Sequence, residues 1–202
     1  MFENAFPREL EQDVLFVESR ILVDGDIKVY AENTIWKLPS KVSVSIPDRV
    51  IFPDSLIPEE EGFSPEQALI YHCIFSRSLD GHVREKHVRE MLESSETWIA
   101  PYILRICENY VVQILQLVFD KLKNSDCTIY IECAQRNLWS FVQGHQRMRS
   151  YWDVYYRRVC PRYENFVGKH LYDECFGYTK SMEKLARREH LKSQENGISE
   201  KP

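Results

Sequence analysis

Residues 80–92 read DGHVREKHVREML, and residues 109–121 read NYVVQILQLVFDK. When the second stretch is laid over the first, with a shift of 29 residues, three kinds of side chain recur in the same order. They are a polar capping residue, a valine and a long hydrogen-bonding side chain: Asp80 with Asn109, Val83 with Val112, and Arg84 with Gln113. Because similarity at a fixed spacing is typical of repeat proteins, this pair predicts helical hairpins stacked side by side.

The sequence before each stretch is also typical of a helix. Ser64-Pro65-Glu66-Gln67 combines an N-cap serine, a proline at the first helical position and a glutamine three residues after the cap. The stretch WIAPYILRICEN, residues 98–109, has Pro101 near its start and apolar residues along its length. Short helices with tight joins are therefore predicted from Ser64 onward. Residues 127–142, CTIYIECAQRNLWSFV, alternate briefly like a strand and then suit a helix, so they leave both structures open.

These features resemble the HEAT-like (armadillo-type) helical repeats over residues 64–123. The positions that carry the resemblance are Pro101, Asn109 and Val112 in one unit, and Asp80, Val83 and Arg84 in the other. The resemblance implies that Asp80 caps its helix, that Val83 enters the groove between units, and that Arg84 reaches a carboxylate or carbonyl next door. Gln113 departs from the arginine that such repeats carry. The DGHVRE segment is also similar to one in bacterial proteins, a likeness that implies no function.

Residues 1–62 have a different character. FVESRILVDGDIKVYAENTIWKL, residues 16–38, places Asp24-Gly25 between runs rich in valine, isoleucine and tyrosine, which predicts a β-hairpin. KVSVSIPDRVIFPDSLIP, residues 41–58, alternates briefly and is interrupted by three prolines, which predicts an extended connector. We therefore expect an extended or hairpin appendage over 1–62, a helical-repeat domain over 63–192 and a polar, frayed tail over 193–202.

Composition indicates an ordinary globular protein. The chain has 202 residues, of which 44% are hydrophobic and 28% charged. The start of the chain lacks a signal-peptide pattern, and no apolar run approaches the roughly 20 residues of a membrane span, so a cytoplasmic location is expected. The six cysteines form no CxxC pair, and in such a protein they are expected to be free and mostly buried.

Charge is unevenly distributed along the chain. The net charge is −5, but residues 1–62 carry 6 basic against 13 acidic side chains, whereas residues 135–202 carry 13 against 8. An acidic front and a basic rear can serve solubility, steer a partner or pair with each other.

The quoted stretch contains two histidines, which raises the question of a metal site. His82 and His87 are five residues apart, which on a helix separates their side chains by about 140°. Metal-binding pairs on one helix require spacings of three or four, so no metal site is predicted, and we expect His87 on the helix surface or at a joint between units. Nucleophile-elbow and phosphate-loop motifs are also lacking. We predict no catalytic residues, no cofactor and a protein that is not an enzyme.

The basic, aromatic segment 135–170 is the candidate for function. Arginine, tyrosine and tryptophan are the residues that dominate protein-binding hot spots, and arginine with aromatic rings can also bind nucleic acid. A third interpretation is that the rings are core and the arginines only cover it. The predicted partner-binding residues are Arg147, Arg149, Trp152, Tyr155, Tyr156, Arg157, Arg158 and Arg162.

The sequence as a whole predicts an all-α fold, a short HEAT-like α-solenoid with a small N-terminal appendage. We expect a protein-binding module that holds one protein partner and no membrane, with an immunity or antitoxin protein as a narrower hypothesis. That hypothesis rests on small size, acidic charge and free cysteines. The alternative is a nucleic-acid-binding HEAT-like protein that uses residues 135–170, with base-directed repair chemistry by analogy to glycosylases of that fold. The acidic net charge argues against general DNA binding.

Overall fold

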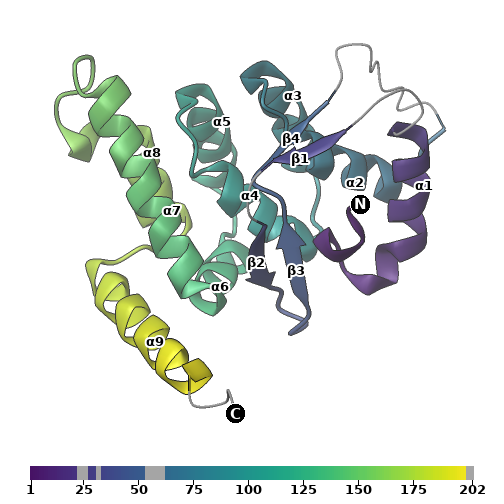
Figure 1. The fold of residues 1–202 in the computed structure, drawn as a ribbon. Helices are drawn as coiled ribbons and strands as arrows, with labels where there is room; N and C mark the ends of the chain where they lie inside the picture. Colours follow the sequence, from purple (N-terminus) through teal and green to yellow (C-terminus); the bar gives the residue numbers. More distant parts are fainter. Residues whose placement is uncertain (22–26, 31–32, 53–61, 199–202) are drawn as a thin grey trace. The chain divides into compact units, whose positions relative to one another are not determined.

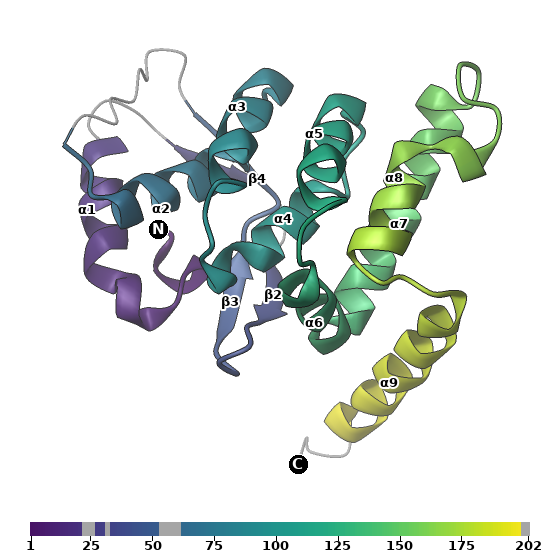
Figure 2. The same cartoon turned by 180° about the vertical axis from the view of Figure 1, so that it is seen from behind.

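The computed structural model describes residues 1–21, 27–30, 33–52 and 62–198. The chain is mostly helical, and it divides into two compact units, Met1–Ile106 and Cys107–Pro202. Figures 1 and 2 show the helices of each unit from opposite sides.

The first unit combines helices with two small antiparallel sheets (Figure 1). Strand β1 pairs with β4, and β2 pairs with β3. Two-stranded sheets are marginal by themselves, so their stability here comes from packing on the helices. The elements are α1 (Glu11–Ile21), β1 (Lys28–Tyr30), β2 (Thr34–Lys37), β3 (Ser43–Ile46), β4 (Arg49–Ile51), α2 (Pro65–Phe75), α3 (Gly81–Met91) and α4 (Ala100–Ile106), with 3-10 turns at Glu3–Ala5, Arg8–Leu10 and Thr97–Ile99.

Helix α1 corrects the predicted hairpin. The apolar run before Asp24-Gly25 is helical as far as Ile21, because Val14, Val17 and Ile21 recur at helical spacing and are all buried. Strand β1, which follows, pairs with β4 instead of with that run. Asp24 and Gly25 themselves lie outside the described residues. The extended connector is confirmed where it can be followed, as β3 and β4.

Residues 1–62 lie in the same compact unit as α2, α3 and α4. Trp36 and Ile46, on β2 and β3, are completely buried. The hydroxyl of Tyr102 in α4 donates a 2.7 Å hydrogen bond to the carbonyl of Ala5. Arg105, also in α4, forms a 2.8 Å ion pair with Asp48 in the turn between β3 and β4. The N-terminal residues therefore supply part of the core and of the polar contacts of the first unit.

Helices α2 and α3 begin as predicted. Ser64 and Gln67 form a complete capping box at the start of α2. At the start of α3, the Asp80 carboxylate accepts a 2.8 Å hydrogen bond from the amide of His82. Each cap satisfies an amide that the first helical turn leaves without a partner.

Arg84 has a local role that differs from the one implied by the repeat resemblance. Its side chain is 1% exposed, and its guanidinium donates to the carbonyls of Ser78 and Leu79, at 2.8 and 2.7 Å. These carbonyls belong to the turn that precedes its own helix. Arg84 therefore closes the turn between α2 and α3.

The second copy of the repeated stretch differs in detail from the first. The overlay places the start of the next helix at Tyr110, but α5 begins two residues later, at Val112. Asn109 accepts hydrogen bonds from the amides of Tyr110 and Val111 in the turn ahead of that helix. Val112, like Val83, is half-buried, and Gln113 is exposed where its counterpart Arg84 is buried. Pro101 is buried at the second position of α4, where a proline is tolerated.

Within its described residues, the second unit consists of helices joined by turns and loops, with no strand (Figure 2). The stretch left open between strand and helix forms α6 and the start of α7, and α8 packs on α5. The elements are α5 (Val112–Leu122), α6 (Thr128–Arg136), α7 (Leu138–Tyr151), α8 (Val167–His170) and α9 (Lys180–Ile198), with π-helical turns at Trp152–Tyr156 and Leu171–Cys175 and a 3-10 turn at Tyr163–Asn165.

Helix α9 extends through much of the predicted tail. It packs on α7, where Leu138 and Val142 form a small core with Ala186. The rings of Trp139 and His190 are stacked at 3.9 Å between centroids. The helix continues to Ile198, so the frayed tail expected from residue 193 is helical as far as the structure describes it.

The described residues also test two expectations from composition. All six cysteines are free, and Cys73, Cys107, Cys133 and Cys175 are buried whereas Cys127 and Cys160 are half-buried. Among the helices of the described ranges, none has the length and apolar character needed to span a bilayer.

Candidate functional site

The segment predicted to bind a partner lies where α7 ends (Figure 1). There the chain forms the π-helical turn Trp152–Tyr156, an irregular loop and a 3-10 turn before α8. Trp152 is buried, and its indole N–H donates a 2.9 Å hydrogen bond to the carbonyl of Cys160. This bond holds the loop against the end of the helix. Single π-helical turns are rare and occur frequently at functional sites.

Three tyrosines form a cluster beside this turn. The ring centroids of Tyr110, Tyr151 and Tyr155 are 5.8 to 6.1 Å apart. The Tyr156 hydroxyl donates a hydrogen bond to the Tyr110 carbonyl and thereby fixes the start of the second unit to the π-helical turn. Tyr155 is 59% exposed and Tyr110 is 44% exposed, so the cluster presents aromatic surface to solvent. Sequence reasoning missed Tyr110, because it lies 25 residues before the segment 135–170.

The π-helical turn and the loop after it carry exposed valines and arginines. Val154 and Val159 are 71% and 80% exposed. Arg157 forms an exposed ion pair with Asp153, whereas Arg158 and Arg162 have no ion-pair partner among the residues that the structure describes. We name this region the tyrosine–arginine surface; it comprises Tyr110, Tyr151, Val154, Tyr155, Arg157, Arg158, Val159 and Arg162.

Four of the predicted site residues have other surroundings. Trp152 is core, as the packing interpretation holds, and half-buried Tyr156 stacks on Phe166 at 5.7 Å. Arg147 forms an ion pair with Glu108, whose carboxylate is buried, so it neutralises a charge inside the second unit. The guanidinium of Arg149 lies 5.3 Å above the centre of the Tyr163 ring.

An open groove adjoins the tyrosine–arginine surface. It has a volume of about 510 Å³, and Arg149 and Arg157 face it together with Val154 and the edge of Trp152. Asp153 lines the groove as well and is paired with Arg157, so Arg149 is the cation that can meet a carboxylate there, beside apolar surface that suits its stem.

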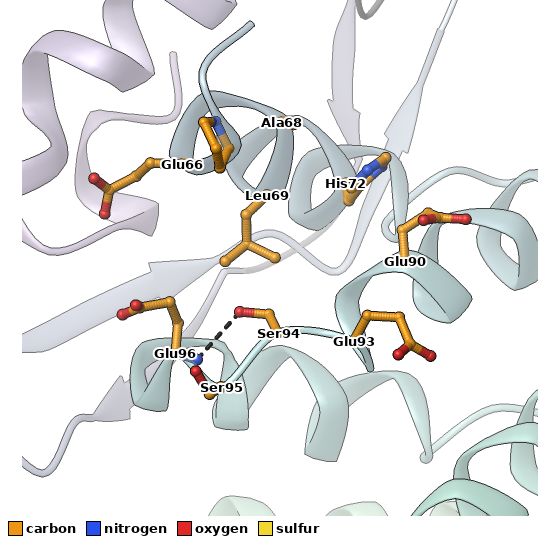
Figure 3. A pocket seen from close by; sticks show the side chains of 10 residues that line it. Glu66, Ala68, Leu69, His72, Glu90, Glu93, Ser94, Ser95 and Glu96 are labelled. Carbon is orange, nitrogen blue, oxygen red and sulfur yellow. Dashed lines mark hydrogen bonds between the residues drawn. The ribbon is translucent and has the colours of Figure 1, made fainter.

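A second groove, in the first unit, has the opposite charge. Figure 3 shows it between α2 and the segment that follows α3, with a volume of about 480 Å³. Four glutamates line it together with His72, and its described lining contains no lysine or arginine. The hydrogen bond drawn in Figure 3 runs from the amide of Glu96 to the hydroxyl of Ser94. Such a groove attracts cations. Its glutamates are Glu66, Glu90, Glu93 and Glu96.

Behind this groove, the fold brings together two histidines that the sequence analysis treated separately. The Nδ1 atoms of His72, in α2, and His87, in α3, are 2.9 Å apart, and both rings are buried. Of the two positions expected for His87, the helix surface is excluded, because α3 turns this side chain toward α2. His82 is exposed in the first turn, as expected. No group of three or more metal-ligating side chains that could hold an ion occurs in the described ranges.

Acid should destabilise the fold through the buried imidazole of His87. Burial, with smaller contributions from His72 and Lys86, lowers the pKa of His87 to about 3 from an ordinary value of 6.5. Between these two pKa values the unfolded chain binds a proton at His87 and the folded chain does not. The free energy of unfolding is therefore unaffected by His87 above pH 6.5 and decreases as the pH drops toward 3. We expect a loss of up to about 1.4 kcal/mol per pH unit from His87 in this window.

Urea unfolding between pH 7 and pH 4.5 measures this loss. His87→Gln should flatten the pH dependence, whereas the matched variant His82→Gln should leave it unchanged, because His82 is exposed. Equal slopes for the two variants would contradict the assignment.

Comparison with family models, with curated proteins and with solved structures finds no match for this chain. The proposed function therefore rests on the chemistry of the chain's own surfaces.

Proposed function

We propose that this chain is a non-enzymatic helical module that binds one protein partner through the tyrosine–arginine surface. The observation that carries the proposal is the combination of exposed Tyr155 and Tyr110 with exposed Val154 and Val159, all beside arginines. Tyrosine and arginine are enriched in binding hot spots, and exposed apolar side chains gain free energy when a partner covers them.

Charge indicates the kind of partner. Residues 147–162 contain five arginines and one aspartate, although the whole chain has a net charge of −5. A partner attracted to this surface should carry aspartate or glutamate side chains around an apolar centre. The groove beside Arg149 and Arg157 can receive one of those carboxylates.

The proposal includes two finer points from the sequence. The first is that the helices form HEAT-like hairpins, a proposal supported by the 29-residue recurrence and by the packing of α2 on α3. The second is that the partner is a protein that this chain keeps inactive, as immunity and antitoxin proteins do. The six free cysteines are in keeping with a reducing, cytoplasmic location for such a pair.

Site-directed photo-crosslinking tests the proposed face. A photoreactive residue at position 155 should crosslink to one protein, and the same residue at position 191 should not. Tyr155 and Leu191 make a matched pair, because both are 59% exposed. The crosslinked protein should then be purified and should form a complex of fixed stoichiometry with the full chain.

Substitution of the exposed residues Tyr155 and Val159 tests how much they contribute to the binding free energy. Tyr155→Ser combined with Val159→Ser should weaken the purified complex by about 30-fold or more, the effect of losing one hot spot of about 2 kcal/mol. Leu185→Ser combined with Leu191→Ser removes exposed apolar side chains from α9 and should leave the affinity unchanged. Equal losses in the two double variants would overturn the proposed face.

Nucleic acid is the alternative partner, because exposed arginines and tyrosines can contact phosphates and bases. In that case nuclease would abolish the crosslinks, and affinity for single-stranded DNA or RNA would fall steeply with salt. The tyrosine cluster favours protein, since its three rings pack against one another and leave less open ring face for bases.

A further inference from the structure

The second unit contains a partly enclosed polar cavity that the tyrosine–arginine surface does not use. Its volume is about 230 Å³, and α7, α8 and α9 contribute to its walls with the turns between them. The residues that matter for its chemistry are His145, Arg149, Tyr163, Tyr178, Lys180 and Glu183.

Stacked rings form the inner wall of the cavity. The His145 ring lies 3.7 Å from the Tyr178 ring, nearly parallel to it, and is 3% exposed. The Nε2 atom of His145 is 3.1 Å from the Tyr163 hydroxyl, while Nδ1 has no hydrogen-bond partner among the described residues. The Tyr178 hydroxyl donates to the carboxylate of Glu183. The wall is thus held in place by contacts from three separate elements.

This wall is uncharged at neutral pH. Burial lowers the pKa of His145 to about 4 and raises the pKa of Tyr163 and of Tyr178. Any charge that a ligand meets must therefore come from the rim of the cavity.

At the rim, two cations remain available. Lys169 and Asp173 form an ion pair with each other, the carboxylate of Glu183 already accepts a hydrogen bond, and exposed Glu164 adds one negative charge to the rim. Arg149 and Lys180 are exposed, and neither has an ion-pair partner within the described ranges. Cations without an ion-pair partner, beside a neutral, ring-lined wall, suit an anion that carries an apolar body.

We propose that this cavity binds a small organic anion, with its carboxylate or phosphate held by Arg149 and Lys180 and its body against the Tyr178–His145 stack. The volume limits the size of the ligand, because pockets for drug-sized molecules occupy about 300–1,000 Å³. The ligand is therefore the size of a small metabolite. A hydrogen-bonding group on it can also reach the Tyr163–His145 pair.

The position of Tyr178 depends on the residue before it. Gly177 has a φ of +66°, a backbone conformation that side chains other than glycine disfavour, and a Cβ atom there would lie 3.4 Å from Ile131. The turn at Gly177 brings Tyr178 back over His145 before α9 begins. Local backbone geometry thus supports the ring stack that the ligand would contact.

Titration of the full chain with defined anions tests the proposal. Inorganic phosphate, acetate and benzoate are added separately at constant ionic strength, while NMR follows the ring signals of His145. At least one anion should shift these signals in a saturable manner, and benzoate should bind at least tenfold more tightly than acetate, because its ring gains apolar contact. The phosphate and carboxylate arms identify which head group the rim prefers.

A matched pair of double variants separates this site from general anion binding. Arg149→Gln with Lys180→Gln should weaken binding at least tenfold, since two charge-assisted contacts are lost. Arg136→Gln with Lys184→Gln removes the same charge from exposed positions that do not line the cavity, and should leave binding unchanged.

Two results would overturn the proposal: no saturable shift with any of the three anions, or equal weakening in the two double variants. Arg149 lines both this cavity and the groove beside the tyrosine–arginine surface, whereas His145, Tyr178 and Lys180 line the cavity and not that groove. The inference therefore rests on groups that the proposed protein partner does not use, and Lys180→Gln alone tests the rim without changing the partner's groove. Loss of partner binding on Tyr155→Ser with Val159→Ser, together with unchanged anion binding, would show that the two sites are separate.

Discussion

Trp36→Ala should lower the free energy of unfolding of the first unit by about 4 kcal/mol, the largest effect that we predict. Trp36 is completely buried on β2, opposite Val44 of β3, so the truncation leaves a large cavity between this sheet and the helices. Urea unfolding measures the loss, and amide hydrogen exchange in α4 shows whether it reaches the helices.

The neighbouring residue provides the control. Ile35 points to the other face of the same strand and is 64% exposed, so Ile35→Ala should change stability by less than about 0.5 kcal/mol. Faster exchange in α4 of the Trp36 variant would support a single core that includes residues 1–62. Unchanged exchange in α4 would favour the interpretation of an N-terminal appendage.

Arg84→Met should cost about 3 kcal/mol, because it leaves the buried carbonyl of Ser78 and the partly buried carbonyl of Leu79 without their charged donor. Removing only the charged donor of such a contact is costly, whereas replacing both the donor and its acceptors by apolar groups need not be. Thermal and urea unfolding give the loss, and the turn between α2 and α3 should show the fastest hydrogen exchange.

The repeat itself supplies the control for Arg84. Gln113 occupies the corresponding position 29 residues later and is exposed, so Gln113→Met should be nearly neutral. If Gln113→Met proved as costly as Arg84→Met, the two positions would have the same role, and the difference between the two copies would be refuted.

Local sequence patterns predicted the helix starts well. The Ser64–Gln67 capping box and the Asp80 cap are contacts between residues only two or three positions apart, so their geometry follows from the chain alone. The helical character of the chain from Ser64 onward is set in the same way, by spacing of apolar residues.

Contacts between distant residues were not predictable in this way. The run before Asp24 is rich in residues that favour strands, yet it forms α1 because Val14, Val17 and Ile21 find a core to enter. Similarly, the bond from Tyr102 to Ala5 spans 97 residues, and no local pattern indicates it.

The candidate site, like the fold, was only partly predictable from the sequence. Sequence composition located the arginine- and tyrosine-rich segment, because a concentration of these residue types is visible without a fold. It did not distinguish exposed Tyr155 from buried Trp152, although both lie in the same π-helical turn. It also did not find Tyr110, the His72–His87 contact or the cavity beside His145.

By itself, then, the sequence determined the predominance of helix, the caps of α2 and α3, and the segment that carries the basic and aromatic side chains. The tertiary structure decided which of those side chains reach solvent, which histidines meet, and where residues 1–62 belong. The physical reason is distance along the chain. Capping and periodicity act within one or two helical turns, whereas burial and ion pairing depend on residues that only folding brings together.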